Sequence, residues 1–219
     1  NRTLATTVIF SGFFLLGILL LMWGILLPRM AAELTMSSFV SGALFTLFSL
    51  GMMMGAIIGG KYASRFEFLP LFASLSLVNA LFIVIAGLMP NWPGLLVIVF
   101  IVGVLSSCKI TIGHTIIAQL YVEKRFAMMG TMDFMFSLGT LVASFYVSLI
   151  FLWQANWRLP LHFLAGLWVI LALFTFLSVR NANAKLPVEK QQESAPKQTL
   201  AFATIVRQPV FLLLAVASF

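Results

Sequence analysis

Two ionisable side chains lie inside long apolar stretches of this sequence, and they are the residues best suited to chemistry. Lys109 belongs to the apolar stretch 94–118, and Asp133 belongs to the next one, 127–153. A charged side chain at the centre of a helix in lipid costs roughly 2.5–3.5 kcal/mol, so neither should face lipid tails. Counted from the ends of their stretches, the two residues lie at depths that differ by only about 4–5 Å. We therefore expect Lys109 and Asp133 to meet across adjacent helices, either as a static ion pair or as a pair that opens when substrate or a proton arrives.

A line of hydroxyl side chains follows Asp133 along the same stretch. At 100° per residue, Asp133 and these hydroxyls fall within an arc of about 80° on a helix. The pattern predicts either the wall of a watery path or hydrogen bonds between neighbouring helices, which Ser and Thr often make in membranes. The aspartate at one end of the line favours the first interpretation, the wall of a watery path. The hydroxyl residues are Ser137, Thr140, Ser144 and Ser148.

The remaining reactive residue types are few. His114 lies about 140° round a helix from Lys109, so these two do not share a face; it is either a proton relay or a core histidine bonded to a nearby carbonyl. With two histidines and one cysteine, Cys108, the chain lacks a zinc or haem constellation. It also lacks a glycine-rich phosphate loop. We expect no catalytic residue, no metal site and no cofactor, and hence no enzyme.

The elements that must position these residues are six apolar stretches. The chain is 62% hydrophobic and 9% charged, with a mean hydropathy of +1.09. Soluble domains are nearer half apolar and a quarter charged, so the composition indicates an integral membrane protein. A crossing helix needs about 20 apolar residues, and nothing here alternates as a β-barrel strand would. The predicted spans are residues 4–27, 38–60, 68–89, 94–118, 127–153 and 159–179.

The cations between these stretches predict the topology. The chain has 13 Lys and Arg against 6 Asp and Glu, but they are scattered between apolar runs, so we expect no nucleic-acid partner. Cytoplasmic loops carry the excess of Lys and Arg. The alternate loops hold only Arg29 and Arg158, which predicts a cytoplasmic N-terminus and a cytoplasmic segment 180–208. The cations on the cytoplasmic side are then Arg2, Lys61, Arg65, Lys124, Arg125, Arg180, Lys185, Lys190, Lys197 and Arg207.

The chain divides into three parts. Residues 1–179 form the predicted six-helix bundle. The polar segment 180–208 cannot bury itself and is expected to be a solvated linker between bundles. Residues 209–219 begin at a proline and are apolar for about half a crossing, as expected for the start of a seventh, truncated transmembrane helix.

Several short stretches resemble the major facilitator superfamily of transporters. Gly60, Ala63 and Arg65 fall in a stretch similar to the family's loop signature after helix two, with Ser64 where the family usually has aspartate. Residues 156–158 and 207–211 also look like the family.

Within the superfamily, the chain is most similar to the fucose/galactose–proton symporter-like branch, including its TsgA-type members. The similarity lies in Trp23 and Gly24, in residues 106–119, and in Tyr121 with 132–139. The sugar symporters of that branch have an aspartate soon after the Trp-Gly pair and a glutamate in helix four. Here the first is missing and Lys109 lies near the place of the second.

The resemblance implies an all-α membrane fold, the six-helix N-terminal bundle of a twelve-helix transporter in the inner (plasma) membrane. It implies proton-coupled secondary transport of a small polar solute by alternating access. The expected partners are the lipid bilayer, a small-molecule substrate and the C-terminal six-helix half. The alternative is a non-transporting membrane scaffold, a partner subunit or a truncated gene product.

Three glycines recur at every fourth position of the second span. Gly51, Gly55 and Gly59 form a small-residue stripe that lets another helix approach closely. Because helix two of the resembled fold packs against the other half of the transporter, we expect this stripe at that boundary. A contact within the same bundle is the alternative.

Overall fold

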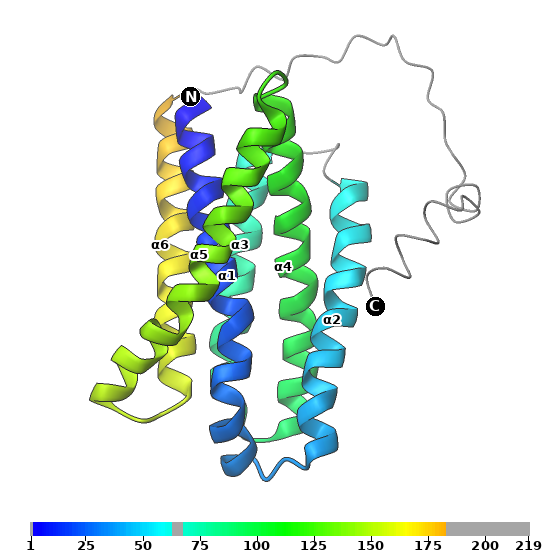
Figure 1. The fold of residues 1–219 in the computed structure, drawn as a ribbon, viewed down its shortest axis with the longest axis vertical. Helices are drawn as coiled ribbons and strands as arrows, with labels where there is room; N and C mark the ends of the chain where they lie inside the picture. The colour runs from blue at the N-terminus through cyan, green and yellow to red at the C-terminus, as the bar shows by residue number, and fades with distance from the viewer. Residues whose placement is uncertain (1, 63–67, 183–219) are drawn as a thin grey trace, which may run out of the picture. The chain divides into compact units, whose positions relative to one another are not determined.

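The computed structural model describes residues 2–62 and 68–182, which form six long helices (Figure 1). All six are long and apolar enough to cross a membrane, which confirms the all-α prediction for this part of the chain. Successive helices run in opposite directions, so α1, α3 and α5 start at one end, named here the Arg2 end, and finish at the Glu33 end. The helices are α1 (Arg2–Glu33), α2 (Ser38–Tyr62), α3 (Phe68–Leu88), α4 (Trp92–Leu120), α5 (Arg125–Trp153) and α6 (Arg158–Ala182).

Some predicted features lie beyond the described residues. Helix α6 continues to Ala182, so the start of the predicted linker 180–208 is helical. The rest of that linker and the run 209–219 lie outside the described residues, as do Ala63 and Arg65 of the loop motif. Gly60, the remaining member of that motif, lies in the last turns of α2.

Helix α1 does not stop before Pro28, as the sequence predicted, but continues through it to Glu33. A proline inside a helix removes one backbone hydrogen bond and crowds the preceding turn, so this extension needs other support. The Glu33 carboxylate accepts hydrogen bonds from Trp157 Nε1 at 2.6 Å and from the Arg158 guanidinium. Arg29 donates to the carbonyl of Ala155 at 2.6 Å. These contacts tie the end of α1 to the residues that join α5 to α6.

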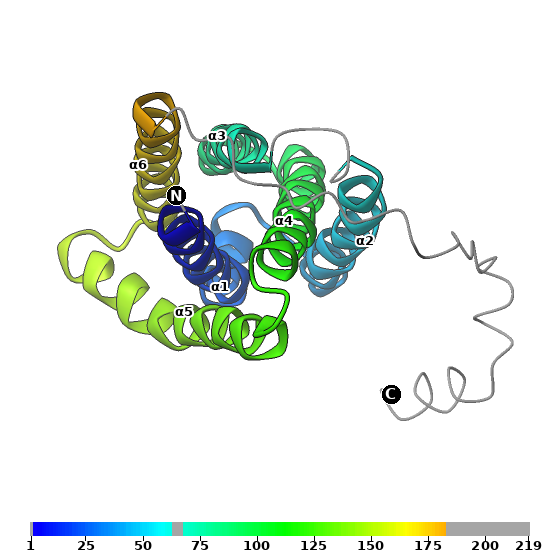
Figure 2. The ribbon, with the colours of Figure 1, turned by 90° about the horizontal axis from the view of Figure 1, so that it is seen from above.

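The main contacts between the six helices follow a repeated pattern (Figure 2). The most extensive contacts join α2 to α4, α1 to α5, and α3 to α6, and smaller ones join α3 to α4 and α1 to α6. These five contacts are related in pairs: if α1, α2 and α3 are relabelled α4, α5 and α6, and the reverse, the same five pairs of helices are in contact. In these main contacts the described helices therefore form two three-helix repeats, with α1 and α4 in equivalent positions.

Glycines hold α1 and α5 in backbone contact. A Cβ added to Gly17 would overlap the carbonyl oxygen of Phe136, and one added to Gly139 would overlap that of Phe14. Each helix thus presents a glycine to the backbone of the other. Close approach of this kind matters in lipid, where helix association relies on van der Waals packing rather than on the hydrophobic effect.

The glycine stripe of α2 makes the equivalent contact with α4. A Cβ on Gly51 or Gly55 would overlap the carbonyl of Phe100 or Val104, and Gly59 lies against the backbone of Cys108. The expectation that this stripe faces a second half of the protein was therefore wrong. The alternative, packing within the bundle, is confirmed, because α4 already occupies the space that these glycines leave.

This packing predicts different outcomes for two alanine substitutions. Gly139→Ala should destabilise the protein by about 1–3 kcal/mol, because the new methyl group overlaps the α1 backbone, which has little freedom to move. Gly166→Ala in α6 should leave stability unchanged or raise it, since nothing lies within 4 Å of the added Cβ. Thermal unfolding of the purified variants in detergent measures both effects. Equal melting temperatures for the two variants would contradict the proposed contact.

Candidate functional site

Lys109 is completely buried in the interior of the six-helix unit. The side chain projects from α4, and its Nζ lies 3.3 Å from the centroid of the Trp168 ring on α6. Trp168 is equally inaccessible. Among the residues that the structure describes, Lys109 Nζ has no hydrogen-bond partner. The terminal nitrogen of Lys109 therefore rests on an aromatic face, with no hydrogen-bond partner among the described residues.

The Trp168 contact is too weak to offset the burial of this charge. A desolvated cation–π contact contributes about 2 kcal/mol, whereas removing an ammonium from water costs several kcal/mol even after the protein relaxes. An apolar side chain would fill the same place at lower cost. The stability of the bundle therefore does not explain why this position holds a lysine.

Asp133 pairs with a histidine rather than with the lysine. Its Oδ1 lies 3.5 Å from His114 Nε2, which joins α5 to α4. The Asp133 side chain is 64% exposed and that of His114 is 35% exposed. The pair thus lies on a side of α4 and α5 that the described residues leave uncovered.

The hydrogen bonding of His114 determines how this pair holds a proton. Nδ1 lies 2.9 Å from the carbonyl oxygen of Ile110, and a carbonyl only accepts, so we assign the hydrogen to Nδ1. Nε2 of the neutral ring is then an acceptor that faces a carboxyl oxygen. One added proton can lie on either partner, as an imidazolium beside a carboxylate or as a carboxylic acid beside a neutral imidazole. The bond to a carbonyl that the sequence offered as one alternative is therefore present, but His114 is partly exposed rather than in the core, and a second titratable group lies opposite it.

The predicted pair of Lys109 and Asp133 was wrong. The two residues were expected to meet because their depths match, but contact also requires that they point toward each other. His114 lies about 140° round α4 from Lys109, and His114 is the residue that faces α5. Lys109 consequently points to α6, away from Asp133.

The hydroxyl line on α5 lies mainly on its uncovered side. Asp133, Ser137, Ser144 and Ser148 are exposed, and Thr140 is half-buried. Ser137 Oγ donates to the carbonyl of Asp133 at 2.9 Å, and Thr140 Oγ1 donates to that of Ser137 at 2.7 Å. For these two residues, the hydroxyl hydrogen bonds to the backbone of its own helix rather than to a neighbouring helix.

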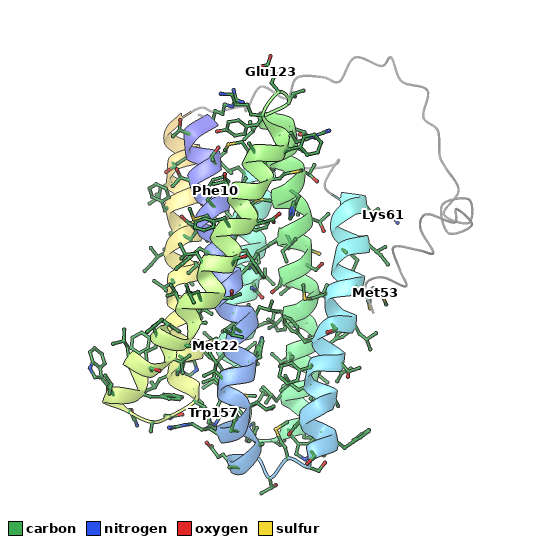
Figure 3. The ribbon with its side chains drawn as sticks, viewed as in Figure 1. Phe10, Met22, Met53, Lys61, Glu123 and Trp157 are labelled. Carbon is green, nitrogen blue, oxygen red and sulfur yellow. The ribbon has the colours of Figure 1, made fainter. Side chains whose placement is uncertain are left out.

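Two interactions were not predicted from the sequence. Trp168 was not identified as the partner of Lys109. A tryptophan within an apolar span looks like any other apolar residue, so the sequence does not indicate that it contacts a lysine. The contact of Glu33 with Arg158 had a usable signal, since these residues of opposite charge lie in two predicted loops on the same side. Figure 3 shows Trp157, the other partner of Glu33, at that end.

The position of Lys109 predicts the effect of removing its charge. Lys109→Met should leave the free energy of unfolding unchanged or raise it by up to about 4 kcal/mol, because a similar apolar volume replaces an unsatisfied cation. Trp168→Ala should lower it by about 3–5 kcal/mol, because it opens a cavity. Thermal or denaturant unfolding in detergent compares the two variants. A loss in Lys109→Met as large as that in Trp168→Ala would show that the cation stabilises the fold.

Comparison with known proteins places this chain in a family. A family model described as Major Facilitator Superfamily matches residues 8–219, which is nearly the whole chain. A search of curated proteins gave no match. The matching family consists of membrane transporters, and the six apolar helices agree with the N-terminal half of its fold. The chain belongs to the major facilitator superfamily.

Proposed function

We propose that this chain is the N-terminal half of a secondary active transporter that moves a small polar solute by alternating access, coupled to protons. The observation that carries the proposal is the pair of His114 and Asp133, which lies within membrane-spanning helices and on their uncovered side. Ionisable residues inside a membrane are costly and characteristically belong to substrate or ion pathways. The fucose/galactose–proton symporter-like branch remains the subgroup that the local motifs favour.

The pair has the properties required of a proton carrier. It can exist as an imidazolium beside a carboxylate or lose one proton, so its charge changes while both side chains stay in place. Ser137, Thr140 and Ser144 continue from Asp133 along α5 and offer hydroxyl oxygens to a polar solute or to water. We assign these residues to the solute and ion pathway, with His114 as the proton relay.

Lys109 has a separate role in this proposal. Because it lies behind the surface that carries the pair, Lys109 in its protonated form adds a buried positive charge whose field reaches the pathway in a medium of low dielectric. We infer that Lys109 adjusts proton affinity rather than forming a bond with Asp133.

Proton-coupled uptake by the intact gene product tests this proposal. Proteoliposomes with an internal pH-sensitive dye are screened with sugars, organic acids and drugs, and each solute that moves protons is retested by solute counterflow. Asp133→Asn should reduce solute-dependent proton movement by about tenfold or more, because an amide cannot take up the proton that the carboxylate accepts. Counterflow should continue, since exchange of solute requires no net proton transfer.

Glu123→Gln is the matched control, because Glu123 is an exposed acid in the connection between α4 and α5. It should leave both readouts unchanged. Proton movement that persists at the wild-type rate in a folded Asp133→Asn protein would refute proton coupling at this pair. Loss of proton movement in Asp133→Asn with wild-type movement in Lys109→Met would refute the role assigned to the lysine.

A further inference from the structure

A buried phenylalanine of α1 lies against the imidazole of His114. The two ring centroids are 5.3 Å apart and the ring planes are inclined by 73°, which is the T-shaped arrangement that aromatic pairs favour. Phe13 is 1% exposed, whereas the side chain of His114 is 35% exposed. The partly exposed histidine therefore has an aromatic neighbour that belongs to the interior of the bundle.

The glycine that precedes His114 makes room for this aromatic ring. A Cβ added to Gly113 would overlap Cε2 of Phe13 and would lie 3.1 Å from its Cζ. The ring thus occupies space beside the α4 backbone that any larger residue would fill. Because Phe13 packs on the residue next to His114, a shift of this ring changes the surroundings of the imidazole directly.

One apolar cluster supports both members of the pair. Phe13 belongs to a group of buried side chains that includes Ile112 of α4 and Met132 of α5. These two residues lie two positions before His114 and one position before Asp133. Protein interiors are close-packed, so side chains within such a cluster keep defined positions. Phe13 therefore connects α1 to the parts of α4 and α5 that carry the pair.

Hydrogen bonding alone does not hold the imidazole toward the carboxylate. Nδ1 of His114 bonds to a carbonyl of its own helix, and Nε2 lies 3.5 Å from Asp133 Oδ1, longer than the usual range for a hydrogen bond from nitrogen to oxygen. Helix α1 has its ionisable residues only near its two ends. Phe13 thus acts on the pair through the position of the imidazole and not through a charge.

We propose that Phe13 is the positioning residue of this proton relay, and that it keeps the imidazole of His114 where Nε2 faces the carboxylate of Asp133. The inference rests on the proposed function, because it takes this pair as the proton carrier. Without the phenylalanine ring, the imidazole turns toward the uncovered side of the helices in another rotamer, and the proton no longer passes between the two groups. The strength of an aromatic pair corresponds to a change of about two- to tenfold in the population of the held orientation.

Chemical labelling of histidine tests the position of the imidazole without requiring transport. Diethyl pyrocarbonate modifies the unprotonated ring, and mass spectrometry of the intact gene product in vesicles gives the labelling rate at each histidine. Phe13→Leu should raise the rate at His114 by about two- to tenfold, because Nε2 no longer lies against Asp133. The rate at His162, which lies in α6, should stay unchanged.

Two further variants separate this role from a general loss of packing. Gly113→Ala displaces the ring of Phe13 without removing it, so it should raise labelling of His114 in the same way. Phe72→Leu is the matched control, because Phe72 is another fully buried ring of the same cluster and lies against Gly12 of α1. It should leave the labelling of His114 unchanged.

Transport assays connect the position of the imidazole with proton coupling. In proteoliposomes, Phe13→Leu should reduce solute-dependent proton movement by about two- to tenfold and leave solute counterflow unchanged, whereas a purely structural defect lowers both. Unchanged labelling of His114 in a folded Phe13→Leu protein would overturn the inference. A parallel fall of proton movement and counterflow would also overturn it, as would increased labelling with wild-type proton movement while Asp133→Asn is impaired. Wild-type proton movement in Asp133→Asn would instead refute the proposed function, whatever the labelling shows.

Discussion

The structure depends on backbone contact between helices at glycines. In lipid, apolar side chains gain little by leaving hydrocarbon for a protein interior, so the helices must be held by close van der Waals contact. Gly17 and Gly139 bring α1 and α5 together, and the stripe at Gly51 and Gly55 does the same for α2 and α4. These two contacts occupy equivalent places in the two three-helix repeats. They hold α5 against α1 and α4 against α2.

Most of the fold could be predicted from the sequence, because six apolar stretches of sufficient length permit few alternatives in a membrane. The bounds were less predictable where distant residues support a helix end. Pro28 is a reasonable local stop, yet α1 continues to Glu33, whose partners Trp157 and Arg158 lie more than a hundred positions later. Such a contact has no local signature. The hydrogen bond that a proline removes from its own helix can be predicted locally. The hydrogen bonds of Glu33 that offset this loss come from residues far away in the sequence.

The candidate site shows the same limit at the level of individual side chains. Depth along a helix follows from counting residues, and Lys109 and Asp133 were correctly placed in membrane-spanning helices. Direction depends on which neighbour lies on each side, which composition does not specify. The separation of about 140° between Lys109 and His114 already meant that a single neighbouring helix would not contact both. In the structure α5 meets His114, while Lys109 points to Trp168.

The contacts of Glu33 also hold one end of α5 in place. At that end α1 is bonded to the short segment that joins α5 to α6, while toward the opposite end α5 and α6 separate. The backbone contact at Gly139 holds α5 to α1 at a second place, near the middle of the helix. For a helix of 29 residues, a tilt of about 5° about the joint would displace the far end by about 4 Å. The glycine contact opposes such a tilt, so the two attachments together keep α5 in one orientation against α1.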